Sequence, residues 1–242
     1  RSVLEREARR LNEVFIKYMT EKRPFVILKA AMSLDGKIAS QAGESKWISG
    51  VVSRRRVHTL RDQVAGIMVG INTVLLDNPL LTTRLGGRIA SDPVKIIVDS
   101  QGRLPLDSTV LNSCSEARVI LATTSRLDSK KAAALRMRGV EIVRVEDADG
   151  RVDLPALMDE LYRWEIDSLL LEGGGELNAS ALKAGIVDKV MIFIAPKLMG
   201  GRGAKTFFEG EGFSQVSAAL KLREVSMENS GDDFLFQGYL RN

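Results

Sequence analysis

The chain has 242 residues, of which 45% are hydrophobic and 27% are charged, and this composition excludes disordered, collagen-like and coiled-coil proteins. Its net charge of +4 is spread over alternating acidic and basic residues, and only 5% of the residues are aromatic, which favours a small phosphorylated ligand over nucleic acid. A single cysteine, Cys114, and a single histidine, His58, exclude an internal disulfide bond and a four-ligand Cys/His zinc cluster. Without a membrane-length apolar run or a signal peptide, the sequence predicts a soluble, cytoplasmic protein.

Hydrophobic periodicity predicts alternating helices and strands within one domain. In chain order, the predicted elements are a helix at 5–20, a strand at 25–31, a helix at 51–63, a strand at 66–70, a short helix before Pro79, strands at 94–99 and 118–122, a helix at 127–139, a strand at 140–145, a helix at 154–164, a strand at 168–171, a helix from the glycines at 173–175 to Lys183 with Gly185 as its C-cap, and strands at 189–195, 220–227 and 234–240. The alternation implies parallel strands with crossover helices, and the turn-rich residues 228–232 imply an antiparallel hairpin. We therefore expect an α/β fold with a mixed, mostly parallel sheet flanked by helices and a C-terminal hairpin.

Several common catalytic patterns are absent from the sequence. There is no phosphate-binding loop of the G-x-x-x-x-G-K-[ST] type and no G-x-S-x-G nucleophile elbow. His58 lies in a charged helix, where a surface role is expected. Asp35, Asp77 and Asp99 lie near strand or helix ends, where aspartates usually cap turns, so no metal site is predicted.

The strongest local signal is an apolar strand that leads through Glu172 into the glycines 173–175 and directly into a helix. Such a junction offers free backbone N–H groups and the positive end of a helix to a phosphate. A tight turn with nothing bound is the equally common alternative. The Rossmann fingerprint fails because Asn178 occupies its last glycine position, so the junction is compatible with a bound nucleotide but not with a standard Rossmann domain.

Basic residues near the other strand ends allow two interpretations each. Lys29 interrupts an apolar strand; it either needs a partner or ligand or, as the sequence alone favours, faces outward. Arg61 and Arg84 flank a loop and either bind a phosphate by forked hydrogen bonds or are ordinary surface residues. Residues 123–126, ending in Arg126, either hold the 2′-phosphate of a cofactor or, as we favour here, cap the next helix.

Five segments together resemble the reductase domain of the bacterial bifunctional riboflavin-biosynthesis deaminase/reductase family. They are KAAMSLDGK (29–37), GESKWI (43–48), VGINTVLLDNPLLTTR (69–84), VDS (98–100) and LEGG (171–174), in the family's order and spacing. The resemblance covers nearly the whole chain. It implies a dihydrofolate-reductase-like fold, usually a homodimer, that uses NADPH to reduce the ribosyl group of a phosphorylated ribosylaminopyrimidine to ribityl.

The resemblance also implies the site residues. NADPH is expected against Ala31, Trp47, Thr73, Asp77, Ser100, Gly174, Gly175, Glu176, Leu177, Asn178, Ala179 and Ser180. The substrate is expected against Ser45, Arg61, Leu81, Arg84 and Glu172. Lys29 and Glu172 are the candidates for moving protons while the nicotinamide donates its hydride. No metal, nucleic acid or membrane partner is implied.

The deaminase half of that family needs a zinc site, and the chain has neither H-x-E nor P-C-x-x-C, so we expect no deaminase activity. Residues 1–22 resemble the linker helix between the two halves, which predicts a reductase domain at 23–242 that is either part of a larger parent or a stand-alone enzyme. Three alternatives stay open for function. They are reduction of the diaminopyrimidine before deamination, reduction of a pterin by the same fold, and a non-catalytic nucleotide-binding module.

Overall fold

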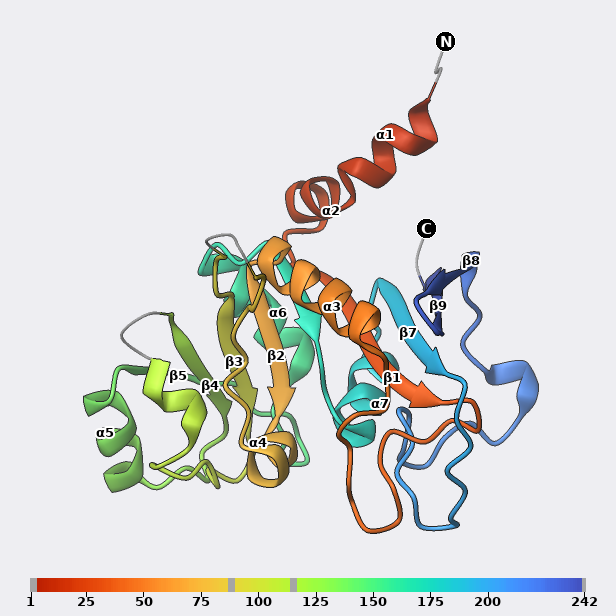
Figure 1. Cartoon of the computed structure of the whole chain (residues 1–242). Coiled ribbons are helices and arrows are strands. Elements are labelled where there is room, and N and C mark those ends of the chain that lie inside the picture. Colours follow the sequence, from red (N-terminus) through yellow and green to blue (C-terminus); the bar gives the residue numbers. More distant parts are fainter. Residues whose placement is uncertain (1–3, 87–89, 114–116, 241–242) are drawn as a thin grey trace.

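The computed structural model describes residues 4–86, 90–113 and 117–240, and within them nine strands form one sheet in the order β5-β4-β3-β2-β6-β1-β7-β9-β8 (Figure 1). The strands are β1 (Phe25–Ser33), β2 (Gly66–Gly70), β3 (Val94–Val98), β4 (Val119–Thr123), β5 (Val140–Arg144), β6 (Ser168–Leu171), β7 (Lys189–Ala195), β8 (Arg223–Ser230) and β9 (Asp233–Tyr239). The helices are α1 (Glu5–Leu11), α2 (Glu13–Glu21), α3 (Val51–Gln63), α4 (Ile71–Asp77), α5 (Ser129–Met137), α6 (Leu154–Arg163) and α7 (Gly175–Lys183), with 3-10 helices at Thr109–Ser113 and Val216–Ala218. The two 3-10 helices were not predicted.

Strand directions confirm the predicted fold class. Strands β1 to β7 pair in parallel, whereas β9 runs antiparallel to both β7 and β8. The hairpin turn is shorter than predicted, because β8 runs to Ser230 and β9 begins at Asp233. Gly231 in this turn has φ +66°, a conformation that glycine adopts without strain.

The strand register recesses the end of β6 between its neighbours. Leu171, the last residue of β6, pairs with Leu28 of β1 and with Met68 of β2. Strand β1 continues from there to Ser33, and β2 continues to Gly70. The residue that follows Leu171 therefore lies at the carboxyl edge of the sheet, between the longer strands β1 and β2. This position between the strand ends is called the crevice below, and open α/β sheets bind ligands at such an edge.

Alternating side chains of β1 enter two separate cores. Val26 and Leu28 pack in the core that contains Leu157 of α6, while Ile27 packs in the core that contains Val57 of α3. Helices α6 and α7 thus cover one face of the sheet and α3 covers the other (Figure 1). By the two-residue period of a strand, Lys29 belongs to the face that α3 covers.

The N-terminal helix is broken, where one helix was predicted. Asn12 separates α1 from α2 with φ −108° and ψ 17°, and its side-chain amide donates to the Ala8 carbonyl at 2.9 Å. Helix α2 is attached to the sheet by a buried ion pair of 2.5 Å between Lys17 and Asp188. Glu13 also accepts hydrogen bonds from Lys189 and Tyr239. Helix α1 projects away from the sheet (Figure 1).

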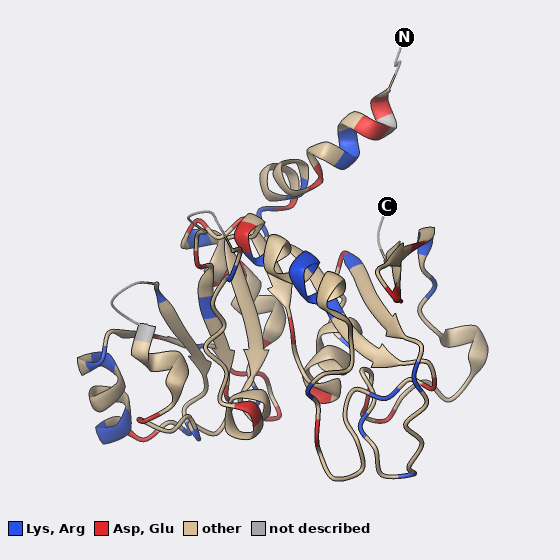
Figure 2. Cartoon of the chain, in the orientation of Figure 1, with Lys and Arg blue, Asp and Glu red and all other residues tan. Residues whose placement is uncertain are grey.

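The charged residues are interspersed along the ribbon (Figure 2). Among the described residues, no helix has both the length and the apolar character needed to cross a membrane. Helix α5 is capped by Asp128, whose side chain accepts hydrogen bonds from the backbone N–H groups of Lys130 and Lys131. The cap predicted for residues 123–126 was therefore wrong: Thr124 instead donates to the Ser100 carbonyl at 2.7 Å, joining the ends of β3 and β4.

Candidate active site

Glu172 is the centre of a buried charge cluster in the crevice beyond β6. Its Oε1 accepts from Nε of Arg61 at 2.8 Å, and its Oε2 accepts from Nη2 of Arg61 at 3.1 Å and from Nζ of Lys29 at 3.3 Å. The side chains of Lys29, Arg61 and Glu172 are only 16%, 14% and 11% exposed. The guanidinium of Arg61 is thus paired with a carboxylate of the protein.

The charges fix the ionisation of this carboxylate. Burial by itself raises the pKa of a carboxyl group, but the charges of Lys29 and Arg61 outweigh burial and hold the pKa of Glu172 at about 2. Glu172 is therefore an anion at neutral pH. It can accept hydrogen bonds and hold a cation in place.

Lys29 reaches Glu172 because of the register described above. Leu28 pairs with Leu171, so the next residues of the two adjacent strands, Lys29 and Glu172, are neighbours. The outward-facing position that the sequence favoured for Lys29 is wrong, since the side chain is largely buried against α3 and paired. An isolated lysine in an apolar strand indicated that a partner was needed. The identity of that partner, Glu172, follows only from the order of the strands in the sheet.

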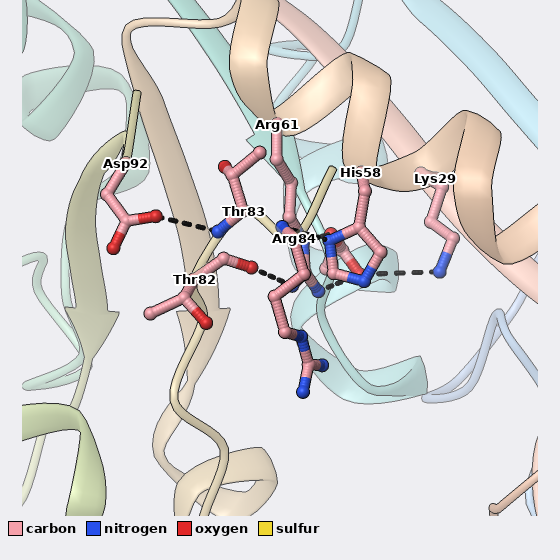
Figure 3. Close-up of polar contacts among 8 residues, drawn as sticks. Lys29, His58, Arg61, Thr82, Thr83, Arg84 and Asp92 are labelled. Carbon is pink, nitrogen blue, oxygen red and sulfur yellow. Dashed lines mark hydrogen bonds and ion pairs between the residues drawn. The ribbon is translucent and has the colours of Figure 1, made fainter. Parts of the chain in front are cut away.

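His58 and residues 82–84 complete one side of the site (Figure 3). The half-buried His58 lies one helical turn before Arg61, so both side chains leave the same face of α3. Arg61 Nη1 donates to the Thr82 carbonyl at 3.0 Å, and His58 Nδ1 accepts from the backbone N–H of Arg84 at 3.1 Å. His58 is thus only half-buried, in keeping with the surface position expected for it, and its spacing of three residues from Arg61 places both on one helical face.

The glycine turn lies on the other side of the crevice, at the start of α7. A Cβ added to Gly174 would meet no atom within 4 Å, whereas one added to Gly175 would lie 2.4 Å from the Thr206 carbonyl oxygen and from Cγ of Glu209. Gly175 is thus required by packing, and Gly174 leaves open space in front of the helix. Backbone N–H groups at such a helix start can receive an anion.

Asn178 explains why the Rossmann glycine is missing. This residue is fully buried, and its Nδ2 donates to the Phe207 carbonyl at 2.9 Å. Its Oδ1 is buried and accepts no hydrogen bond from the part of the chain that the structure describes. The side chain therefore fixes the 206–209 loop against α7 and keeps one acceptor at the glycine turn.

The loop after β1 brings further predicted residues to this edge. Ser45 donates to Asp77 at the end of α4 over 3.3 Å, and the carbonyl of Trp47 accepts from Nζ of Lys197 at 3.0 Å. Trp47 is 62% exposed, and the Arg54 guanidinium lies 4.5 Å from the centre of its ring. The hydrogen bond to the Trp47 carbonyl and the cation–π contact with Arg54 therefore hold this side chain at the surface.

The other predicted residues are distributed over the same carboxyl edge. Ala31 lies in β1, Thr73 in α4, and Ser100 follows β3, where its Oγ accepts from the Val152 N–H at 3.0 Å. Leu81 is buried at 4% exposure, and Arg84 is exposed with its guanidinium extending away from the cluster (Figure 3). Within α7, Glu176 accepts from Asn72 and Ser180 donates to the Glu176 carbonyl. The side chain of Leu177 lies next to Gly70, and Ala179 is buried.

Two of the turn aspartates bind backbone groups, as predicted. Asp35 accepts from the N–H groups of Met199 and Gly200 at 3.0 and 2.7 Å. Its hydrogen bond from Ser33 and these two backbone donors lower its pKa to about 2. Asp99 is fully buried and accepts from the Leu104 N–H at 2.8 Å. These contacts fix the loops that surround the site.

Known proteins share both the sequence and the fold. The family model of the RibD C-terminal domain matches residues 24–236. The chain is 47% identical over 233 residues to the riboflavin biosynthesis protein RibD of Actinobacillus pleuropneumoniae, covering 96% of this chain and 61% of that protein. It is 42% identical over 216 residues to the 2,5-diamino-6-ribosylamino-4(3H)-pyrimidinone 5′-phosphate reductase of Methanothermobacter thermautotrophicus, covering 89% of this chain and 97% of that protein.

A solved structure gives the same result. The crystal structure of a diaminohydroxyphosphoribosylaminopyrimidine deaminase/5-amino-6-(5-phosphoribosylamino)uracil reductase from Thermotoga maritima is similar with a TM-score of 0.80 and 36% sequence identity. The similarity covers 98% of this chain and 62% of that one, so the chain spans less than two thirds of the two-domain relatives. The resemblance seen in the sequence is confirmed: the chain belongs to the RibD C-terminal domain family, whose relatives are named as riboflavin-biosynthesis reductases.

Proposed function

We propose that this chain is an NADPH-dependent reductase that converts the ribosyl group of a phosphorylated ribosylaminopyrimidine to ribityl in riboflavin biosynthesis. The observation that carries the proposal is the Lys29–Glu172–Arg61 cluster, which lies in the crevice beyond β6 and immediately before the glycine turn. A buried charge cluster beside an open helix start suits a polar sugar on one side and a dinucleotide on the other.

The residues of the glycine turn fit a nicotinamide dinucleotide. Gly174 leaves the space in front of α7 free of side chains, and the buried Asn178 side chain fixes the 206–209 loop against the start of that helix. Residues 174–180 would hold the pyrophosphate, with Thr73, Asp77 and Ser100 on one flank and Ala31 and Trp47 on the other. When bound, the nicotinamide supplies a hydride for the anomeric carbon of the sugar.

The side chains of the protein itself position the substrate and supply a proton. Glu172 is ionised, so it accepts hydrogen bonds from sugar hydroxyls and keeps Lys29 in place. Lys29 carries the proton that the reduced sugar needs, at an Nζ held 3.3 Å from Oε2 of Glu172. Arg61 orients Glu172, and the exposed Arg84, with Ser45 and Leu81, would bind the phosphorylated substrate.

Two substrates remain candidates, because the relatives are named for both. The Methanothermobacter protein, nearly all of which aligns with this chain, is named for the diaminopyrimidine, and the Thermotoga protein is named for the deaminated uracil. We propose the deaminated uracil as substrate and the diaminopyrimidine as the alternative. A non-catalytic nucleotide-binding module is the third possibility, and the intact Lys29–Glu172 pair argues against it.

Turnover of both pyrimidines tests the proposal. Purified protein should consume NADPH, measured by its absorbance, only when one of the two ribosylaminopyrimidine phosphates is added. Lys29→Met should abolish this turnover, whereas Lys130→Met on the exposed surface of α5 should leave it unchanged. NADPH binding without turnover of either pyrimidine would favour the non-catalytic module, and turnover of dihydrofolate alone would favour a pterin substrate.

We also propose that the chain forms a homodimer through β8 and β9. Strand β8 lies at the edge of the sheet, and Val225, Met227 and Phe234 on the hairpin are 51%, 65% and 42% exposed. An exposed apolar edge strand pairs readily with another chain. Analytical ultracentrifugation should give a dimer for the wild type and a monomer for Met227→Glu; a monomeric wild type would contradict the proposal.

A further inference from the structure

Side chains from other parts of the chain form a hydrogen bond with the backbone of each of the residues 82, 83 and 84 (Figure 3). The carbonyl of Thr82 accepts from Arg61 at 3.0 Å, and the N–H of Thr83 donates to Asp92 at 2.7 Å. The N–H of Arg84 donates to Nδ1 of His58 at 3.1 Å. This segment follows Leu81, which has φ +55°, so its course depends on these side chains rather than on a regular element.

The bond from Arg84 to His58 determines the protonation state of the imidazole. A ring nitrogen that accepts a hydrogen bond carries no proton, so His58 is neutral and has its proton on Nε2. The groups around the ring agree with this state. Burial, Arg61 on α3 and Arg84 itself lower the pKa of His58, Lys29 of β1 lowers it too, and only Glu172 beyond β6 raises it.

We propose that His58 is a positioning residue, whose neutral Nδ1 fixes the backbone of Arg84 and thereby places the Arg84 guanidinium for the phosphate of the substrate. This inference rests on the proposed reductase function, and it extends it by assigning a role to the one histidine of the chain. Arg84 is exposed, so the placement of its long side chain depends on where its backbone is held.

The same geometry makes substrate binding sensitive to pH. Of the side-chain types that hold this segment, only histidine ordinarily changes its charge between about pH 5 and 8. A proton on Nδ1 would turn the acceptor into a donor facing the donor N–H of Arg84, and the bond would be lost. Because burial and the neighbouring cations lower the pKa of His58, the bond is present at neutral pH and is lost as the pH falls below about 6.5, the ordinary value for histidine.

Two substitutions distinguish the role of the Nδ1 acceptor from that of the rest of the imidazole ring. His58→Ala removes the acceptor, and His58→Asn places an amide oxygen that does not titrate close to the position of Nδ1. We expect His58→Ala to raise KM for the phosphorylated pyrimidine about five- to tenfold, the value of one lost hydrogen bond, with kcat and KM for NADPH within about twofold of the wild type. His58→Asn should restore KM, and Gln63→Ala, at an exposed position of α3, should behave as the wild type.

The pH dependence gives a second test with the same proteins. KM of the wild type should rise as the pH is lowered through the titration of His58, and KM of His58→Asn should not follow this titration. An unchanged KM in His58→Ala, or a failure of Asn to restore it, would overturn the proposal. If His58→Ala does not fold, the comparison of the wild type with His58→Asn across pH still decides it.

A spectroscopic measurement separates this inference from the proposed function. Because His58 is the only histidine, untagged ¹⁵N-labelled protein gives one set of imidazole signals. We expect the tautomer with the proton on Nε2 and a titration midpoint below that of free histidine. A proton on Nδ1 at neutral pH would overturn the role of His58, whereas absent turnover with the expected tautomer would refute the reductase assignment and leave the backbone contact in place.

Discussion

The two sides of the crevice beyond β6 differ in how far their polar groups are paired with other groups of the protein. On the proposed substrate side, Lys29 and Arg61 pair with Glu172. On the proposed cofactor side, Gly174 faces open space and the Oδ1 of Asn178 has no partner among the described residues. The first side is therefore paired before any ligand binds, and the second leaves open space at the start of a helix.

Burial explains the difference. A carboxylate that is 11% exposed needs cations and hydrogen bonds from the protein, because an unpaired buried charge is strongly destabilising. The glycine turn carries no charge of its own, so it can leave backbone N–H groups for a ligand without that penalty. The predictions below test each side of the crevice separately.

The largest expected effect is on turnover when Glu172 loses its charge. Glu172→Gln keeps the size of the side chain but no longer holds Lys29 by charge, and we expect kcat to fall by about 100-fold or more with little change in NADPH affinity. Glu141→Gln is the matched control, since Glu141 also pairs with an arginine, Arg118, at 2.8 Å on the protein surface. Turnover of Glu172→Gln within a few-fold of the wild type would show that Glu172 has no catalytic part.

The charge of Glu172 should also appear in acid stability. Its pKa is lowered from 4.5 to about 2, so its contribution to folding is complete above about pH 4.5 and is lost as the pH falls towards about 2. This shift corresponds to about 3 kcal/mol. Denaturant titrations at several pH values should show that the free energy of unfolding of the wild type falls by about this much more than that of Glu172→Gln. Asp35, whose pKa is also lowered, is present in both proteins and cancels. Parallel curves would contradict the paired state.

Adjacent glycines test the cofactor side. Gly175→Ala places a Cβ 2.4 Å from the Thr206 carbonyl oxygen and should lower the free energy of unfolding by about 1–3 kcal/mol. Gly174 has φ −74° and ψ 173°, which alanine adopts freely, so Gly174→Ala should preserve stability and weaken NADPH binding about tenfold. Thermal melts and NADPH titrations of the two variants decide the point. Normal NADPH affinity in Gly174→Ala would place the cofactor elsewhere.

The smallest expected effect concerns the choice between NADPH and NADH. Arg126 lies against Gly150, where an added Cβ would meet its Nη2 at 2.5 Å, and it follows Thr124, which donates to the Ser100 carbonyl at 2.7 Å. Since Asp128 caps α5, Arg126 is available for the 2′-phosphate, and Arg126→Ala should lower the preference for NADPH over NADH about fivefold. Arg136→Ala on α5 is the control. The ratio of kcat/KM values for the two cofactors measures the effect, and an unchanged ratio rejects this role.

Local sequence patterns predicted most of the fold, because buried strands and amphipathic helices have distinct periods. The bounds of α3, β2, β6 and β7 agree with the prediction, whereas the break at Asn12 and the tight hairpin at Gly231 depend on local hydrogen bonds that periodicity does not report. The pairing of Arg61 with Glu172 joins residues far apart in the chain, and only strand order brings them together. The contact of His58 was likewise not predictable, because its partner, the N–H of Arg84, belongs to a separate segment.

Transfer of isotope from cofactor to product tests the central claim most directly. With NADPH deuterated at C4 of the nicotinamide, on the face that reacts, the wild-type protein should yield a ribitylaminopyrimidine phosphate heavier by one mass unit, with the deuterium at the former anomeric carbon. Lys29→Met and Glu172→Gln should yield little of this product in the same time. Oxidation of NADPH without deuterium in the pyrimidine, or no product from either pyrimidine, would contradict the assignment of this chain as the reductase.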